Sequence, residues 1–102
     1  MRTLTDVEGT PVRLTDERWA HILEHPEMSG QEQKIAEALQ TPDVVVCSPH
    51  DPAVRLYHRL HDETPVTRKY LVVVVKHSER GAFIITAFFT DRQKRGVRIW
   101  PP

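Results

Sequence analysis

Two apolar, β-rich runs between residues 69 and 90 constrain the fold of this chain more than any other stretch. The first, Leu71–Val75, contains only Leu and Val, as expected of a strand that is covered on both faces. The second, Phe83–Phe89, is rich in aromatic and β-branched residues, which also favour a strand. The polar connection His77–Gly81 contains a glycine and is typical of a hairpin loop. We therefore expect an antiparallel hairpin at the centre of a sheet.

The rest of the chain predicts two helices followed by short strands. Thr15 is a good N-cap for the first helix, and Pro26 ends it, because the residue before a proline avoids helical backbone. The remaining elements are expected at residues 16–25 and 31–40 (helices), 43–48 and 54–61 (strands), and 97–100 (a last short strand or a return to the core). Residues 2–8 alternate only weakly, and Val12 and Leu14 are compatible with a short edge strand.

This order of elements indicates an α+β fold. We expect one domain over residues 1–102, with two N-terminal helices packed on one face of a mostly antiparallel sheet of about four strands. The other face of the sheet is then free to be polar and functional.

Composition excludes several classes of protein. No apolar run approaches the ~20 residues of a membrane span, and Met1–Thr10 lacks the apolar core of a signal peptide. The single cysteine, Cys47, excludes an internal disulfide. We expect a cytoplasmic protein that makes no membrane contact.

The formal net charge is zero, but the charges are unevenly distributed. Residues 1–53 hold four Lys or Arg against ten Asp or Glu, whereas residues 54–102 hold ten against four. A basic half can attract phosphate groups. Chance segregation of surface charge explains the pattern equally well.

One short motif matches a zinc site. His21-Ile22-Leu23-Glu24-His25 fits the H-x-x-E-H pattern of a class of zinc peptidases. Pro26 places His25 at the frayed end of a short helix, and the chain offers no obvious third ligand for a catalytic zinc. We interpret the motif as a chance match and expect no metal and no cofactor.

Period-two alternation predicts a polar sheet face. On residues 54–61 the polar side chains of one parity are Arg55, Tyr57, Arg59 and His61. Cations and hydroxyls on such a face can stabilise the charge that develops when a phosphodiester is cleaved, and aromatic rings can stack on unpaired bases. The alternative is an ordinary solvated sheet face. We interpret His58, which has the opposite parity, as a hydrogen-bonded core histidine.

Two further sets of residues fit a phosphate-binding surface. Tyr70 and Lys76 share one parity on the next strand. On the last long strand the shared parity contains Ile84, Thr86, Phe88 and Thr90. A basic tail follows, with Arg92, Lys94, Arg95 and Arg98. Such a tail neutralises phosphates without selecting a base sequence, although many C-terminal loops look alike.

Five segments together resemble one family. They are RWAHILEHPEM at 18–28, PDVV at 42–45, RLYHR at 55–59, KYLVVVVK at 69–76 and FIITAFFTDR at 83–92. The series resembles small phage- and bacterium-associated domains of the barnase–EndoU–colicin–RelE-like (BECR) group of nucleases, in the same order from about Leu14 to Trp100. Members are compact α+β ribonucleases or RNA-cleaving toxins with N-terminal helices on a four-stranded antiparallel sheet, and they act without a metal.

The resemblance implies a toxin-like, metal-independent endoribonuclease that acts on tRNA or mRNA by general acid–base catalysis. His25 would be the acid or base, with His21 as its substitute. Arg59 and Lys69 would bind the scissile phosphate. Thr86, the last member of the catalytic set, or Thr90 would hydrogen-bond that phosphate. Further contacts to the substrate are expected from Tyr57, Tyr70 and Arg92, with Tyr70 stacking on or orienting the RNA.

One condition applies to two neighbouring residues of this set. Lys69 and Tyr70 face opposite sides of a regular strand, so both can serve one site only if Lys69 lies at its irregular start. The alternative function is a non-catalytic module that kept the fold and binds RNA or a protein, for example an inhibitor. A monomer and a homodimer are both compatible with the sequence.

Overall fold

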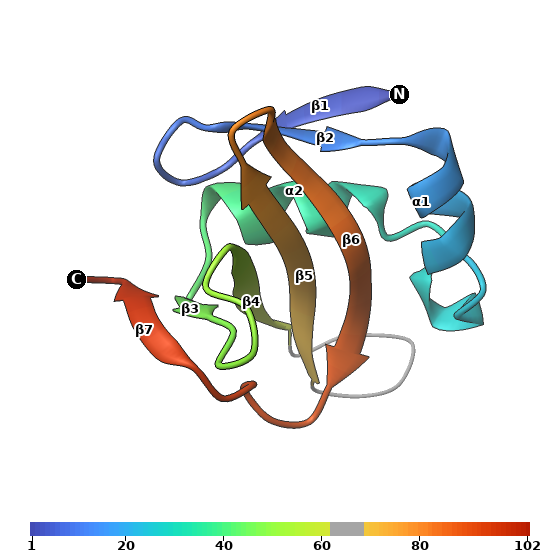
Figure 1. Ribbon diagram of the computed structural model, residues 1–102. Coiled ribbons are helices and arrows are strands. Elements are labelled where there is room, and N and C mark those ends of the chain that lie inside the picture. Colours follow the sequence, from blue (N-terminus) through green and yellow to red (C-terminus); the bar gives the residue numbers. More distant parts are fainter. Residues whose placement is uncertain (62–68) are drawn as a thin grey trace.

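The computed structural model describes residues 1–61 and 69–102, which form a sheet of seven strands and two helices (Figure 1). The strands are β1 (Arg2–Thr5), β2 (Pro11–Leu14), β3 (Val44–Cys47), β4 (Val54–His61), β5 (Lys69–Ser78), β6 (Gly81–Thr90) and β7 (Val97–Trp100). The helices are α1 (Asp16–Ile22) and α2 (Glu32–Gln40), and a short 3₁₀ turn, η1 (Pro26–Met28), lies between them. No helix of this part of the chain is long and apolar enough to cross a membrane.

The strand order is β1-β2-β6-β5-β4-β3-β7. Neighbouring strands are antiparallel except β2 and β6, which run parallel where Val12 and Arg13 pair with Ala82 and Phe83. The sheet is therefore mixed. The first and last strands of the chain lie at its two edges.

The prediction of two N-terminal helices on about four mostly antiparallel strands is wrong. A hairpin of β1 and β2 precedes the helices, and it joins the sheet by a parallel pairing with β6. The physical reason is the shortness of β1, β2, β3 and β7, which have four residues each. So few residues carry little periodicity, and the partner of β2 lies at the far end of the sequence.

Several single elements are confirmed. The hairpin of residues 69–90 is the centre of the sheet, because β5 and β6 pair with each other and lie between β2 and β4. The strand predicted at 54–61 is β4, and the helix predicted at 31–40 is α2. The first helix is shorter than predicted and ends at Ile22 rather than His25. The N–H groups of Glu24 and His25 bond three residues back, in tight turns that close the helix before Pro26.

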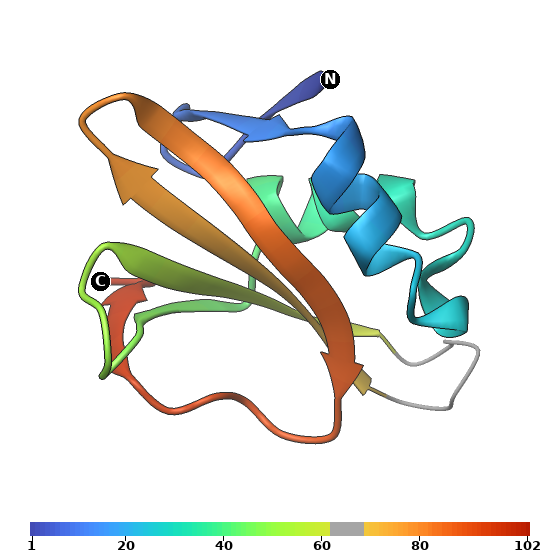
Figure 2. The ribbon, with the colours of Figure 1, turned by 45° about the vertical axis from the view of Figure 1, so that its right-hand side comes forward.

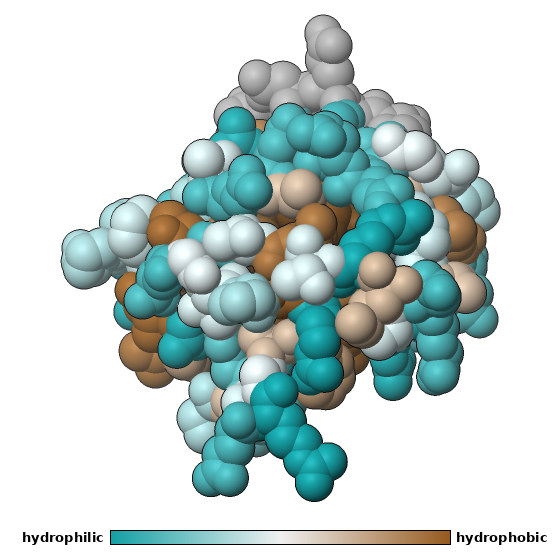
Figure 3. Space-filling model, turned by 90° about the horizontal axis from the view of Figure 1, so that it is seen from above, coloured by the Kyte–Doolittle hydropathy of each residue, from teal (hydrophilic) through white to brown (hydrophobic). Residues whose placement is uncertain are grey.

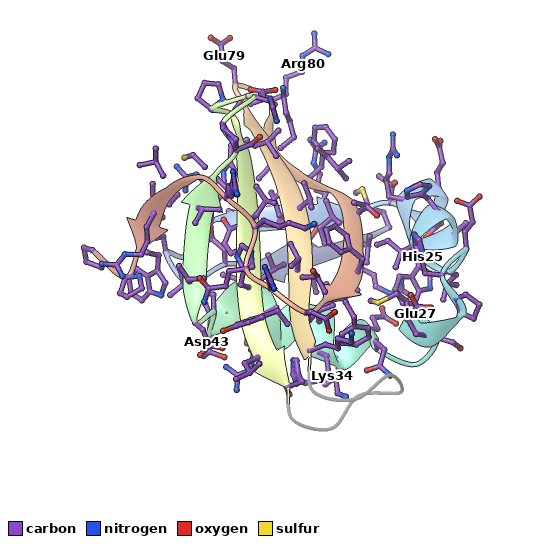
Figure 4. The ribbon with its side chains drawn as sticks, turned by 90° about the horizontal axis from the view of Figure 1, so that it is seen from below. His25, Glu27, Lys34, Asp43, Glu79 and Arg80 are labelled. Carbon is purple, nitrogen blue, oxygen red and sulfur yellow. The ribbon has the colours of Figure 1, made fainter. Side chains whose placement is uncertain are left out.

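Both helices cover the same face of the sheet (Figure 2). The core lies between the two helices and the sheet. It contains alternate residues of the strands and side chains from both helices. Its members include Ile22, Ile35, Leu39, Tyr57, Leu71, Val73, Val75, Ile84 and Ala87. We call the other side of the sheet the open face. The connection between β6 and β7, residues 91–96, crosses it (Figure 4).

An irregularity in the pairing of β5 with β6 separates two residues that the sequence places together. Val75 pairs with Ile84, but Val74 pairs with Thr86, so the register shifts between them. Ile84 therefore lies in the core while Thr86 lies on the open face. The prediction that Ile84 and Thr86 share one face is wrong.

Candidate functional site

The polar side chains of β4 lie on the face that the helices cover, and the prediction that they form the free face is wrong. Arg55, Tyr57 and Arg59 pair with Val75, Val73 and Leu71, which are core residues. Tyr57 itself is only 1% exposed. The reason is that the β6–β7 connection covers the other side of β4, which carries Leu56 and His58. The alternation of residues along β4 does not show which of its two sides the helices cover.

The hydroxyl of Tyr57 belongs to a sealed polar network. It donates to Oδ2 of Asp6 at 2.7 Å, and Asp6 is 3% exposed. Oδ1 of Asp6 accepts from the backbone N–H groups of Glu8 and Thr10 at 2.9 and 2.8 Å. The carboxylate therefore holds the β1–β2 turn and fixes it against β4.

His77 completes this sealed network. Its Nε2 lies 3.1 Å from the Tyr57 oxygen, and since the phenol proton goes to Asp6, Nε2 is the donor. Burial raises the pKa of Tyr57, and the Asp6 carboxylate adds to the effect. Burial lowers the pKa of His77, and the Arg55 guanidinium adds to that. Both groups are thus neutral at pH 7.

The outer side of this network is closed by polar groups. Arg55 Nη1 lies 3.3 Å from Oε1 of Glu8. Seen from above, the surface over the N-terminal hairpin and the β5–β6 turn carries mainly hydrophilic side chains (Figure 3). The network is a structural support, and Tyr57 is not available to stack on a base.

Two predicted phosphate ligands already have partners in the protein. Arg59 Nη1 donates to the carbonyl oxygen and to Oγ1 of Thr41, at 2.5 and 2.7 Å, where α2 leads into β3. Lys69 forms an ion pair with Asp91. Lys69 pairs in regular register with His61 as the first residue of β5, so it faces the helix-covered side while Tyr70 faces the open face, and the condition for one shared site is not met.

Four predicted site residues meet at the end where β5 begins and β6 finishes. We call this group, Lys69, Tyr70, Thr90 and Arg92, the ladder end. Tyr70 and Thr90 are paired neighbours on the open face. Gln93 donates to the Tyr70 hydroxyl at 3.2 Å, which brings the β6–β7 connection to the same place.

His21 and His25 are exposed beside the sheet rather than on the open face. The end of α1 and the η1 turn lie next to the C-terminal half of β6 in all three views (Figures 1, 2 and 4). His21 Nδ1 lies 3.0 Å from Oε2 of Glu24, and His25 Nδ1 lies 3.9 Å from Oε1 of Glu27. His25 thus flanks the strand that carries Thr86 and Thr90.

The β6–β7 connection is held firmly on the open face by His58. The backbone N–H of Lys94 donates to His58 Nε2 at 2.9 Å, and His58 Nδ1 donates to the Leu56 carbonyl at 3.1 Å. Each ring nitrogen has one partner, which fixes the neutral tautomer. Burial lowers the pKa of His58, and the Lys94 ammonium adds to this. The interpretation of His58 as a hydrogen-bonded core histidine is confirmed.

Gly96 holds the far end of this connection. A Cβ atom at this position would lie 2.1 Å from the carbonyl oxygen of Cys47. Only glycine permits so close an approach to β3 without a shift of the backbone. The connection therefore has a defined path over the sheet.

This connection brings unpaired cations onto the open face. Within residues 1–61 and 69–102, no carboxylate forms an ion pair with Arg92, Lys94 or Arg95. The Lys94 ammonium lies over the ring of Phe88, 5.3 Å from its centroid. Phe88 is partly exposed, and cations beside accessible aromatic rings form the combination that single-stranded nucleic acids recognise.

A pocket of about 270 Å³ lies between the β3–β4 turn and the connection. Its lining residues are Ser48, Pro49, His50, Leu56, Lys94 and Arg95. Sequence reasoning identified Lys94 and Arg95 as basic residues but missed Ser48 and His50. The rigid P-H-D-P turn was the available signal, but only the sheet register places it beside the basic connection.

The described part of the chain contains no group of three or more His, Cys, Asp or Glu side chains that could hold a metal ion. His21 and His25 do not share a helical face, because α1 ends between them. The arrangement offers cations, hydroxyls and imidazoles as its reactive groups.

Comparison with known families identifies the kind of protein. The family described as phage-Barnase-EndoU-ColicinE5/D-RelE like nuclease2 matches residues 1–101. The chain belongs to this family. The resemblance seen in the sequence is confirmed, and the chain is a member of a phage-associated nuclease family. The comparisons with curated proteins and with solved structures gave no match.

Proposed function

We propose that this domain is a metal-independent endoribonuclease that binds single-stranded RNA on the open face of its sheet. The observation that supports this most is the β6–β7 connection, whose Lys94 and Arg95 form no ion pair within the described residues. The connection places Lys94 over the ring of Phe88 and both cations beside the pocket at the β3–β4 turn. The cations would bind phosphates, and Tyr70 and Phe88 would contact unpaired bases. Family membership supports cleavage in addition to binding.

In this proposal the reaction takes place at the ladder end. The 2′-hydroxyl of the RNA attacks phosphorus, the bond to the 5′-oxygen of the next nucleotide breaks, and a cyclic phosphate forms. One group takes the 2′ proton and another gives a proton to the leaving oxygen. His25 is the best placed exposed histidine beside β6, and near pH 7 an imidazole can act in either role.

The other groups of the ladder end would hold the phosphate. Arg92 supplies positive charge, Lys69 would add to it only by leaving its ion pair with Asp91, and Thr90 supplies a hydroxyl next to Tyr70. Thr86 lies farther along the same strand on the same face and would contact the neighbouring part of the RNA. Tyr57 takes no part because it is buried.

The test compares an RNA oligonucleotide with a DNA of the same base sequence, both in excess EDTA. The expected result is cleavage of RNA alone, with a 2′,3′-cyclic phosphate at the new end. His25→Ala should reduce the rate by ~100-fold or more, as expected for loss of a general acid or base. Arg80→Gln, at the distant β5–β6 turn, is the control and should cleave normally (Figure 4). Cleavage of the DNA, or inhibition by EDTA, would contradict the mechanism.

One observation favours a second candidate, an RNA-binding module without catalysis. The predicted catalytic set is divided, because Arg59 lies on the helix-covered side and is bonded to Thr41 while Thr86 lies on the open face. Salt-sensitive binding of RNA without any cleavage would support this alternative. Growth arrest on expression that His25→Ala abolishes would support the toxin-like enzyme instead.

A further inference from the structure

We infer that the pocket between the β3–β4 turn and the β6–β7 connection binds a single nucleotide, with its base against Pro49 and Leu56 and its phosphate on Lys94 and Arg95. The role of this nucleotide as part of an RNA substrate rests on the proposed function. The binding itself does not.

The size of the pocket fits one nucleotide. Its volume of about 270 Å³ lies just below the ~300–1,000 Å³ of pockets that enclose drug-sized ligands. Two lining residues, Pro49 and Leu56, present apolar surface, and two others, Ser48 and His50, can form hydrogen bonds. A flat base edged with donors and acceptors suits this mixture better than a purely apolar ligand does.

The charge of the pocket selects for a phosphate. Lys94 and Arg95 line it, and no carboxylate group does. The nearby carboxylate of the β3–β4 turn, Asp51, forms an ion pair with Lys76, and this hydrogen bond lowers the pKa of Asp51. Asp51 is thus charged but already neutralised, so it does not compete for the two pocket cations.

Both walls of the pocket are fixed before any ligand arrives. On one side the Ser48 N–H bonds to the Val54 carbonyl at 2.9 Å, and Ser48 Oγ accepts from the His50 N–H at 3.2 Å. On the other side His58 bonds the backbone of both Leu56 and Lys94. A preformed site loses little conformational entropy on binding, which favours a small ligand.

The pocket lies close to the ladder end along the β6–β7 connection. Arg92 belongs to the ladder end and Arg95 to the pocket, and the three residue steps from one to the other span at most ~10 Å. One RNA strand can follow the connection from one to the other. A nucleotide held in the pocket would then fix the place at which the neighbouring phosphodiester is cleaved.

Binding is tested with adenosine 5′-monophosphate as the probe, using chemical shift changes of the backbone amides and calorimetry. The expected result is saturable binding, with shifts at Ser48, His50 and Arg95. Lys94→Gln and Arg95→Gln should each weaken binding by about tenfold, as expected for one charged hydrogen bond. The Lys94 variant keeps the backbone bond to His58, so its fold is retained.

Arg98→Gln is the matched control, because Arg98 is an exposed arginine of β7 that does not line the pocket. Equal loss of binding in Arg98→Gln and Arg95→Gln would overturn the site. Inorganic phosphate that binds as tightly as the mononucleotide would overturn the contact with the base.

The outcomes separate this inference from the proposed nuclease function. A protein that cleaves RNA but does not bind the mononucleotide contradicts the pocket and leaves the nuclease intact. A protein that binds the mononucleotide without cleaving RNA supports the pocket and contradicts the nuclease. If both hold, Arg95→Gln should raise KM for RNA about tenfold and leave kcat within about twofold.

Discussion

Two histidines of this domain lie on opposite faces of one sheet and have different structural roles. His77 belongs to the sealed network under the β1–β2 turn, where Tyr57 and Asp6 already use each other's donors and acceptors. His58 lies beneath the open face and holds the backbone of a segment whose cations stay without carboxylate partners in the described residues. Both imidazoles are neutral and structural. The difference is that His77 is bonded within a network whose polar groups pair with one another, whereas the bonds of His58 hold only backbone and leave the cations of the connection unpaired within residues 1–61 and 69–102.

This comparison separates stability from recognition. In the sealed network Asp6 and Tyr57 have almost no contact with water and His77 is half-buried, so their loss should affect folding and not RNA cleavage. Residues of the connection are exposed, and its path over the sheet is held by the backbone bond to His58 and by Gly96, so the side chains of Lys94 and Arg95 can change without loss of the fold. Four predictions test this difference, beginning with the largest effect.

The first prediction sets Tyr57→Phe against Tyr70→Phe. Without its hydroxyl, Tyr57 leaves a buried Asp6 oxygen without a donor, which should lower the free energy of unfolding by about 3 kcal/mol. Tyr70 is partly exposed, and its change should stay within about 0.5 kcal/mol. Urea unfolding followed by circular dichroism measures both. Equal stability of the two variants would show that the network is not sealed.

The second prediction concerns Gly96→Ala. The new Cβ would collide with the Cys47 carbonyl of β3, so the connection and the start of β7 must move away from β3, at a loss of about 2 kcal/mol. The same variant should also bind the mononucleotide more weakly, because the wall of the pocket that carries the cations moves. Gly9→Ala serves as a control, since a Cβ there meets nothing within 4 Å although its φ of 85° is strained. It should destabilise the fold and leave binding unchanged. A Gly96→Ala variant that binds normally would contradict the fixed path of the connection.

The third prediction is a loss of stability in acid. The pKa values of His58 and His77 are lowered in the folded protein, so below the ordinary histidine value of about 6.5 the unfolded chain takes up protons first. The free energy of unfolding should therefore fall as the pH drops from 6.5 toward the pKa values of these histidines in the folded protein. Below those pKa values the two histidines should cause no further change. His58→Gln and His77→Gln should each flatten the profile between pH 7 and 5. His50→Gln, whose residue is exposed, is the control.

The fourth prediction is the smallest and leaves the fold unchanged. The double variant Lys94→Gln/Arg95→Gln should reduce the salt dependence of RNA binding by about 1.4 in log–log slope, which is ~0.7 for each lost phosphate contact. Thermal stability should be the same as in the wild type. An unchanged slope would place the RNA elsewhere on the protein.

The sequence was most informative where a pattern is long. The runs 71–75 and 83–89 predicted β5 and β6, and alternation over residues 54–61 predicted the whole of β4. Family residues such as Lys69, Tyr70, Thr90 and Arg92 meet at one end of the sheet, as pairing of the two long strands requires. These features depend on neighbours in sequence or on one hairpin.

The features that the sequence did not predict depend on distant contacts. The direction of Tyr57 is set by Asp6, which lies in a turn of the N-terminal hairpin and has no local sign of its role. The parallel pairing of β2 with β6 and the register shift beside Thr86 are likewise invisible in a local pattern. For β4, the polar residues lie on the helix-covered side because the β6–β7 connection covers the more apolar side, and no local pattern shows the path of that connection.

The path of residues 91–96 also has a consequence for synthesis of the protein. This segment is held at one end by β6 and at the other by β7, which pairs with β3. While the chain emerges from the ribosome, at roughly 5–20 residues per second, β4, β5 and β6 can pair before β7 exists. The surface proposed to bind RNA is then still incomplete. If the domain cleaves RNA as proposed, a nascent chain that has not yet released β7 should leave the messenger and the ribosomal RNA around it uncut.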